Sequence, residues 1–141
     1  MKKRLKCIML VDDDADDNYY HQVILKKMDI TDHVEVAESG PEALDYLRKE
    51  GQVPDIIFLD INMPGMSGWD FLDEYKKLNA EEKKTVIIVM LTTSISPVDK
   101  EKADKMSEIT SFKSKPMTKE MLNDILERYF SDTADNEVEK N

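Results

Sequence analysis

Four apolar runs of the sequence end on residues that could take part in phosphoryl chemistry. CIMLV leads into Asp12 and Asp13, DIIFL into Asp60, TVIIVML into Thr92, and SFKS into Lys115. Carboxylates hold divalent cations and attack phosphorus, whereas hydroxyl and ammonium groups neutralise the oxygens of a phosphoryl group. The sequence therefore predicts a phosphoryl-transfer site, provided that the ends of these runs converge.

The three carboxylates predict a metal site. Like charges at one point of a fold repel one another unless a cation or a proton neutralises them. Mg²⁺ prefers oxygen ligands and commonly uses one or two carboxylates together with a phosphate. We therefore expect Asp12, Asp13 and Asp60 to bind Mg²⁺, with the backbone carbonyl of Asn62 as a further ligand.

Asp60 is the candidate nucleophile, because carboxylates form aspartyl phosphates. Lys115 and Thr92 could then each take one oxygen of the phosphoryl group. The two histidines, His21 and His33, fall in a predicted helix and a predicted strand, away from these strand ends. No general base is needed if Asp60 attacks a ready-made phosphodonor.

Each of these residues also has a structural explanation. The aspartates after the first run could cap the next helix, and Asp60 could hold a turn. Thr92 could cap a helix as well, and Lys115, just before Pro116, could be a solvated loop residue. An acid pair, an acid, a hydroxyl and a lysine at successive strand ends favour the functional interpretation.

The elements that must position these residues alternate along the chain. The apolar runs predict strands, and helical spacing of apolar residues predicts helices between them. The expected strands are 6–11, 33–37, 55–59, 86–91 and 110–113, and the expected helices are 15–29, 41–50, 68–79, 97–106 and 118–130. Five strand–helix units predict an α/β doubly wound sandwich with a parallel sheet, in which ligands bind at the carboxyl ends of the strands.

Local signals support these elements. Ser67 and Thr118 are expected N-caps, and Pro41 suits a first helical turn. The first, third and fourth strands are almost continuously apolar, as expected for parallel strands covered on both faces. The segment 97–106 is mostly charged and should be the most loosely held helix.

Composition limits the classes of function. The chain has 141 residues and a formal net charge of −10, which suits one domain and disfavours binding to nucleic acid or to an anionic membrane. The single cysteine, Cys7, excludes an internal disulfide, and no apolar run approaches the ~20 residues that cross a bilayer. We expect a cytoplasmic protein with one domain at 4–130 and a disordered acidic tail at 131–141.

Four motifs resemble those of a known family. LVDDD at 10–14, LDINMPGMSGWDFL at 59–72, MLTTS at 90–94 and SFKSKP at 111–116 are similar to the motifs of response regulator receiver domains. The resemblance to these CheY-like domains covers about residues 4–130. It implies a flavodoxin-like doubly wound sandwich with a five-stranded parallel sheet of order 2-1-3-4-5.

The resemblance also implies roles for single residues. Asp60 would be the phosphoacceptor, with Asp12, Asp13 and the Asn62 carbonyl completing a Mg²⁺ site. Thr92 would be the switch hydroxyl, Lys115 would contact the phosphoryl group, and the bond between Lys115 and Pro116 would be cis. The switch aromatic would be Phe112, where many members have tyrosine.

The implied function is that of a single-domain response regulator. A sensor histidine kinase or a histidine phosphotransfer protein would phosphorylate Asp60. An unknown downstream protein would then bind the face made by the fourth helix, fifth strand and fifth helix. The chain would be a monomer or a weak homodimer, and it would not be an enzyme beyond self-phosphorylation and self-dephosphorylation.

Two other classes stay open from the residues. One is a receiver-like scaffold that binds a partner without phosphorylation. The other is a Mg²⁺-dependent aspartyl phosphotransferase or phosphatase. Such enzymes usually place a second acid two residues after the nucleophile, where this chain has Asn62.

Overall fold

The computed structural model describes residues 4–49, 53–78, 86–93 and 95–130. Within these ranges, five strands alternate with five helices, as the sequence predicted. The strands are β1 (Leu5–Val11), β2 (Thr31–Ala37), β3 (Ile56–Leu59), β4 (Ile87–Thr92) and β5 (Ser111–Ser114). The helices are α1 (Ala15–Met28), α2 (Gly40–Arg48), α3 (Gly68–Tyr75), α5 (Pro97–Asp104) and α6 (Lys119–Phe130). The predicted tail at 131–141 lies outside the described residues.

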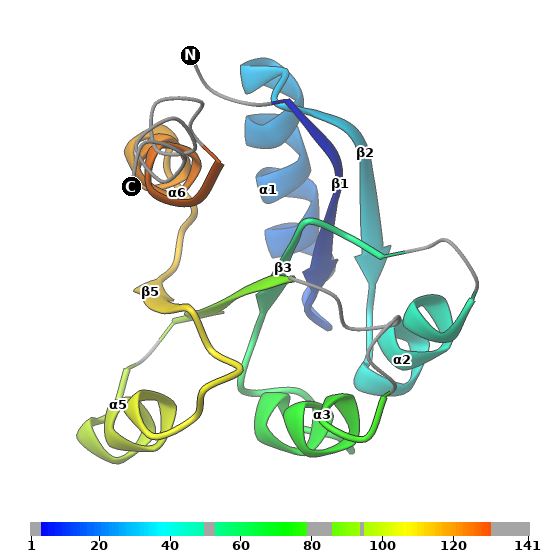
Figure 1. Ribbon diagram of the computed structural model, residues 1–141, viewed down its shortest axis with the longest axis vertical. Helices are drawn as coiled ribbons and strands as arrows, with labels where there is room; N and C mark the ends of the chain where they lie inside the picture. The colour runs from blue at the N-terminus through cyan, green and yellow to red at the C-terminus, as the bar shows by residue number, and fades with distance from the viewer. Residues whose placement is uncertain (1–3, 50–52, 79–85, 94, 131–141) are drawn as a thin grey trace, which may run out of the picture.

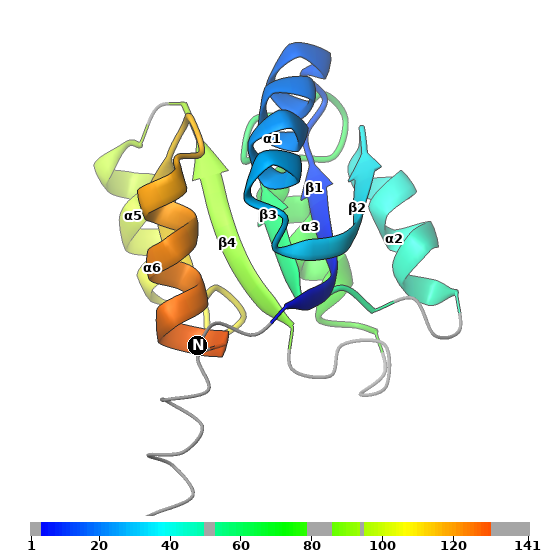
Figure 2. The same cartoon turned by 90° about the horizontal axis from the view of Figure 1, so that it is seen from above.

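The five strands form one parallel sheet in the order β2-β1-β3-β4-β5, so the predicted fold is confirmed. The registers pair Val11 with both Ala37 and Leu59, and Leu59 with Met90. Because paired strands end level with one another, the residues that follow β1, β3 and β4 meet at one edge of the sheet. Figure 2 shows the arrowheads of β1, β2 and β4 pointing the same way.

The helices cover both faces of the sheet. Figures 1 and 2 show α1 and α6 on one face, and α2, α3 and α5 on the other. Each face has its own apolar core. Leu25 of α1 and Ile125 of α6 belong to one core with Ile8 and Val89. Leu47 of α2 belongs to the other core, on the opposite face of the sheet. Burial on both faces explains why β1 and β3 read as continuous apolar runs.

The helix starts follow the predicted capping chemistry. The Ser67 side chain accepts from the Asp70 N–H, and the Asp70 carboxylate accepts from the Ser67 N–H, which makes a capping box at α3. The Thr118 hydroxyl accepts from the Met121 N–H at 3.1 Å. Pro41 lies in the first turn of α2. These caps fix where the loops that carry the site residues end.

The helix ends were predicted less well than the starts. The expected helices 41–50, 68–79 and 97–106 end at Arg48, Tyr75 and Asp104, and the predicted end positions 50 and 79 lie outside the described residues. Lys76 and Lys105 keep helical backbone angles beyond the last helical residues. The Lys76 N–H still donates to the Leu72 carbonyl over a regular helical turn, whereas the Lys105 N–H donates to the Lys102 carbonyl over a shorter turn, so neither helix stops at a sharp signal. Apolar residues continue past α3 at Leu78 and past α5 at Met106, which explains the longer predictions for these two helices.

The weakly anchored helix is α5. Ala103 is its one buried residue, whereas α6 buries Leu122, Ile125 and Leu126. Val98 on α5 is 74% exposed. The prediction that 97–106 is loosely held therefore agrees with the burial of its side chains. Among the described residues, no helix is long and apolar enough to cross a membrane.

Candidate functional site

The acidic cluster lies at the carboxyl edge of the sheet. Asp12, Asp13 and Asp60 each contribute one carboxylate oxygen, and these three oxygens lie within 4.8 Å of one another. Backbone hydrogen bonds extend the sheet past its strands, from the Asp12 N–H to Ala37 and from the Asp60 N–H to Val11. Asp12 and Asp60 are buried, while Asp13 is exposed. The predicted convergence of β1 and β3 ends therefore occurs.

Lys115 brings a positive charge to this cluster from the end of β5. Its Nζ lies 2.6 Å from Asp12 Oδ2, 2.7 Å from Asp17 Oδ2 and 3.6 Å from Asp60 Oδ2. Burial alone would lower the pKa of Lys115, but the hydrogen bonds to Asp12 and Asp17 raise it above its usual value. The peptide bond between Lys115 and Pro116 is cis, as the resemblance implied.

The Asp60 carboxyl is under electrostatic strain. Burial, followed by the nearby Asp12 charge, raises the pKa of Asp60 above its ordinary value. Lys115 and the Asn62 N–H lower the pKa again without cancelling the rise. A buried carboxylate with a raised pKa, beside two other carboxylates, is the environment that a divalent cation would stabilise.

The Thr92 hydroxyl has no hydrogen-bond partner. Thr92 is fully buried at the end of β4, and its Oγ1 has no partner within hydrogen-bonding geometry. The hydroxyl still lies close enough to the Asp60 carboxyl to act on it as a weak donor and lower its pKa, although the geometry falls short of a regular hydrogen bond. Because buried polar groups are almost always satisfied, the hydroxyl beside Asp60 is a donor that a further acceptor oxygen would satisfy.

The loop after Asp60 is held by close backbone packing. Gly65 has a φ of +79°, which suits glycine, and the Gly68 N–H donates to the Ile61 carbonyl at 2.8 Å. A Cβ at Gly68 would lie 2.5 Å from the Asp60 carbonyl oxygen. The start of α3 therefore packs directly on the peptide of Asp60, which fixes where its carboxylate emerges.

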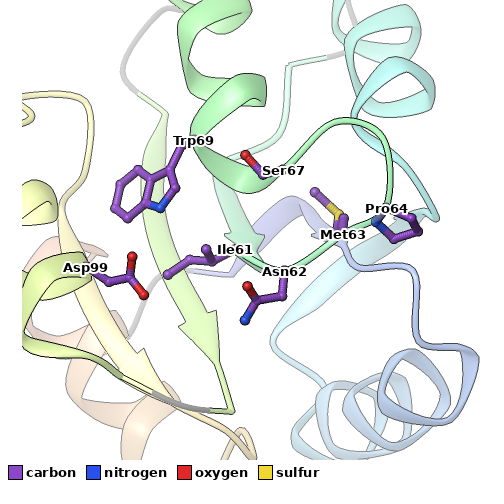
Figure 3. Close-up of a pocket in the computed structure, with 7 residues that line it drawn as sticks. All are labelled: Ile61, Asn62, Met63, Pro64, Ser67, Trp69 and Asp99. Carbon is purple, nitrogen blue, oxygen red and sulfur yellow. The ribbon is translucent and has the colours of Figure 1, made fainter.

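A surface hollow of about 480 Å³ lies beside the loop that follows Asp60, between α3 and α5. Figure 3 shows Trp69 of α3 and Asp99 of α5 lining this hollow together with Ile61 and Asn62. Lys102 of α5 lies over the Trp69 ring, with its Nζ 4.8 Å from the ring centroid. The indole is therefore positioned to report on changes near Asp60 and α5.

The structure brings together the predicted residues Asp12, Asp13, Asp60, Thr92 and Lys115, although their roles stay predictions. Asn62 is exposed next to the cluster. Phe112 is half-buried against the core on the α3 and α5 side of the sheet. The role of the Asn62 carbonyl as a ligand and that of Phe112 as a switch also stay predictions.

Three residues of α1 were missed by sequence reasoning. Asp17 pairs with Lys115, Asn18 Nδ2 donates to the Asp12 carbonyl at 2.8 Å, and His21 Nε2 accepts from the Met117 N–H at 3.4 Å. Burial, followed by the Lys115 charge, lowers the pKa of His21. His21 lies four residues after Asp17 and three after Asn18, a spacing that places side chains on one face of a helix. This spacing was a usable signal that the three residues have neighbours in common.

Comparison with known proteins gives one consistent result. The family model described as "Response regulator receiver domain" matches residues 8–127. The chain is 30% identical over 131 residues to Two-component response regulator ARR22 of Arabidopsis thaliana, covering 92% of this chain and 87% of that protein. The matched region of the chain includes every predicted site residue.

Two further similarities define the extent of the match. The chain is 29% identical over 121 residues to Sensor histidine kinase CheAY of Helicobacter pylori, but it spans only 14% of that protein's length. A crystal structure of a two component response regulator from Cytophaga hutchinsonii superposes with a TM-score of 0.83 and 29% identity, covering 89% of this chain and 97% of that one.

Proposed function

The chain belongs to the response regulator receiver family of two-component signalling, and we propose that Asp60 is its phosphoacceptor. The observation that carries this proposal is the arrangement around Asp60. Two more carboxylates, the Lys115 ammonium and the unpaired Thr92 hydroxyl surround one buried carboxyl. This set supplies a nucleophile together with neutralising groups for a transferred phosphoryl group.

Asp12, Asp13 and Asp60 would hold Mg²⁺, with the Asn62 carbonyl as a further ligand. The oxygen-only donor set of the cluster suits this ion, and the raised pKa of Asp60 gives a physical reason for cation binding. When bound, the cation supplies charge neutralisation for the phosphoryl oxygens.

In the proposed reaction, an Asp60 carboxylate oxygen attacks the phosphorus of a phosphohistidine. The oxygen–phosphorus bond forms as the nitrogen–phosphorus bond breaks, and its electron pair stays on the imidazole nitrogen of the donor. Lys115 pairs with one phosphoryl oxygen, and the Thr92 hydroxyl donates to another. In the phosphorylated form the Thr92 hydroxyl gains an acceptor that it lacks in the unphosphorylated form, and this new hydrogen bond favours phosphorylation.

The signalling step would follow from these contacts. As Thr92 turns toward the phosphoryl group, Phe112 moves inward, and the populations of states at α5, β5 and α6 change. The loose anchoring of α5 supports placing the change there. A downstream protein would recognise this face.

The donor would be a sensor histidine kinase or a histidine phosphotransfer protein. We assign the receiver domain to residues 4–130 and regard it as a regulator rather than an enzyme with turnover. Asn62 supports this view, because aspartyl phosphatases usually place an acid at that position. No observation favours the scaffold alternative.

The proposed function is tested by binding of beryllium fluoride, which mimics an aspartyl phosphate. Trp69 fluorescence follows a titration in Mg²⁺, with Asp60→Asn as the matched variant. Saturable binding in the wild-type protein and loss of binding in Asp60→Asn are expected. A folded wild-type protein that binds Mg²⁺ but not beryllium fluoride would rule out the phosphoacceptor role.

A further inference from the structure

Lys115 has a third acidic partner, which the proposed function does not use. Asp17 Oδ2 lies 2.7 Å from Lys115 Nζ, nearly as close as Asp12 Oδ2 at 2.6 Å. The distance from Lys115 Nζ to Asp60 Oδ2 is 3.6 Å, beyond hydrogen-bonding range. The ammonium is therefore hydrogen-bonded to Asp12 and Asp17, whereas its ion pair with Asp60 is longer.

The position of Asp17 favours this pairing. Asp17 lies in the first turn of α1, where the helix N-terminus favours a negative charge, and the turn is capped by Asp14. The Lys115 side chain is only 9% exposed, so its ammonium has little access to water as a replacement partner. Two short contacts use two of its three N–H donors.

Phosphorylation changes what Lys115 must do. The Asp60 carboxylate would become a phosphoryl group with more negative charge, and the same ammonium would have to pair with it. A cation at the cluster would also draw the Asp12 carboxylate away from Lys115. Asp17 would then be the remaining competitor for the ammonium.

We propose that Asp17 is a positioning residue that holds Lys115 on the α1 side of the site and so weakens its pairing with a group on Asp60. This inference rests on the proposed function, because it assumes that Lys115 serves a phosphoryl group. Asp17 thereby sets how readily the phosphorylated state forms. Removing its charge releases the ammonium toward Asp60.

The test compares Asp17→Asn with Asp16→Asn. Asp16 is exposed, lies in the same helical turn and has no contact with Lys115 in the structure. Both variants remove one negative charge from the start of α1, but only Asp17→Asn breaks the pair. With Mg²⁺ and beryllium fluoride as the probe, we expect about fivefold tighter binding in Asp17→Asn, the scale of one partly exposed ion pair.

Two further variants separate the positioning of Lys115 by Asp17 from the general effect of removing a negative charge near the site. Asp17→Glu keeps the charge and is expected to restore wild-type affinity. In a Lys115→Met background, Asp17→Asn is expected to change the affinity no more than Asp16→Asn does, since the ammonium for which Asp17 competes is absent. Equal tightening by Asp16→Asn and Asp17→Asn, or weaker binding in Asp17→Asn, would overturn the proposal.

A spectroscopic measurement keeps the test independent of beryllium fluoride. The ammonium signal of Lys115 in ¹H–¹⁵N spectra of the metal-free protein should shift in Asp17→Asn and stay unchanged in Asp16→Asn. An unshifted signal in a folded Asp17→Asn variant would overturn the inference. Failure of the wild-type protein to bind beryllium fluoride would instead overturn the proposed function, so the two failures are distinguishable.

Discussion

At the residue scale, the site contains buried polar and charged groups, some of which lack a hydrogen-bond partner or a neutralising charge. Asp60 is buried with a raised pKa, Thr92 Oγ1 lacks a partner, and Lys115 is shared among three carboxylates. The first two features cost stability in the unphosphorylated protein, because buried polar and charged groups need partners. The carboxylates around Lys115 instead stabilise its ammonium, which raises its pKa. A phosphoryl group and a cation would satisfy the hydroxyl and neutralise the buried carboxylates.

The unpaired hydroxyl leads to a stability prediction. Thr92→Val keeps the shape of the side chain and removes the unsatisfied oxygen, so the free energy of unfolding should rise by about 1 kcal/mol. Urea denaturation without divalent cations measures the change. Thr92→Ser, which keeps the hydroxyl and loses a methyl group, should instead lower the stability. A Thr92→Val protein less stable than wild type would show that the hydroxyl is satisfied in solution.

The candidate site residues were predictable from sequence because they lie at the carboxyl ends of strands or just after them. Asp12, Asp60 and Thr92 needed only the rule that parallel strands end at one edge. Asp17 was not predictable in this way, because its role depends on the reach of a lysine 98 residues away. Helix periodicity places Asp17 on a face but does not specify the partner across the fold.

At the scale of elements, the fold was predictable where local signals and burial agree. Continuous apolar runs gave β1, β3 and β4, and the capping residues Ser67 and Thr118 gave helix starts. The strand order was available only through the resemblance, because five interchangeable strands carry no pairing information in their patterns. Helix ends were overestimated where apolar spacing continued into frayed turns.

The anchoring of α5 leads to a dynamic prediction. One buried residue, Ala103, holds α5, whereas three hold α6, so hydrogen exchange should be at least about tenfold faster at the α5 amides. Beryllium fluoride should change the protection of α5 more than that of α6. Mass spectrometry or NMR measures both. Equal protection of α5 with and without the mimic would contradict the proposed output face.

At the scale of the whole molecule, the chain is acidic, with a formal net charge of −10, and its buried acids lie at one edge of the sheet. The raised pKa of Asp60 means that its ionised form is disfavoured in the folded state. The stability that protonated Asp60 contributes is fully present below the pKa of Asp60 in the unfolded state. This stability is lost as the pH rises through the pKa of Asp60 in the folded state. At neutral pH, ionised Asp60 therefore destabilises the metal-free fold.

Asp60→Asn should consequently raise the melting temperature of the metal-free protein at neutral pH, and the difference should shrink on acidification. Mg²⁺ should raise the melting temperature of the wild-type protein more than that of Asp60→Asn, because ligand binding to the folded state stabilises it. Thermal denaturation with and without Mg²⁺ measures both effects. Asp73→Asn, an exposed change on α3, is the control and should keep the wild-type response to Mg²⁺.

The close packing at Gly68 has a consequence for how sequences of this fold can diverge. A side chain at Gly68 would collide with backbone atoms of Asp60 and Ile61, which no neighbouring substitution can remove. A side chain at Gly40 would instead collide with the Met66 thioether, and a smaller residue at that position would relieve the collision. Among related sequences, position 68 should therefore stay glycine, whereas positions 40 and 66 should vary together.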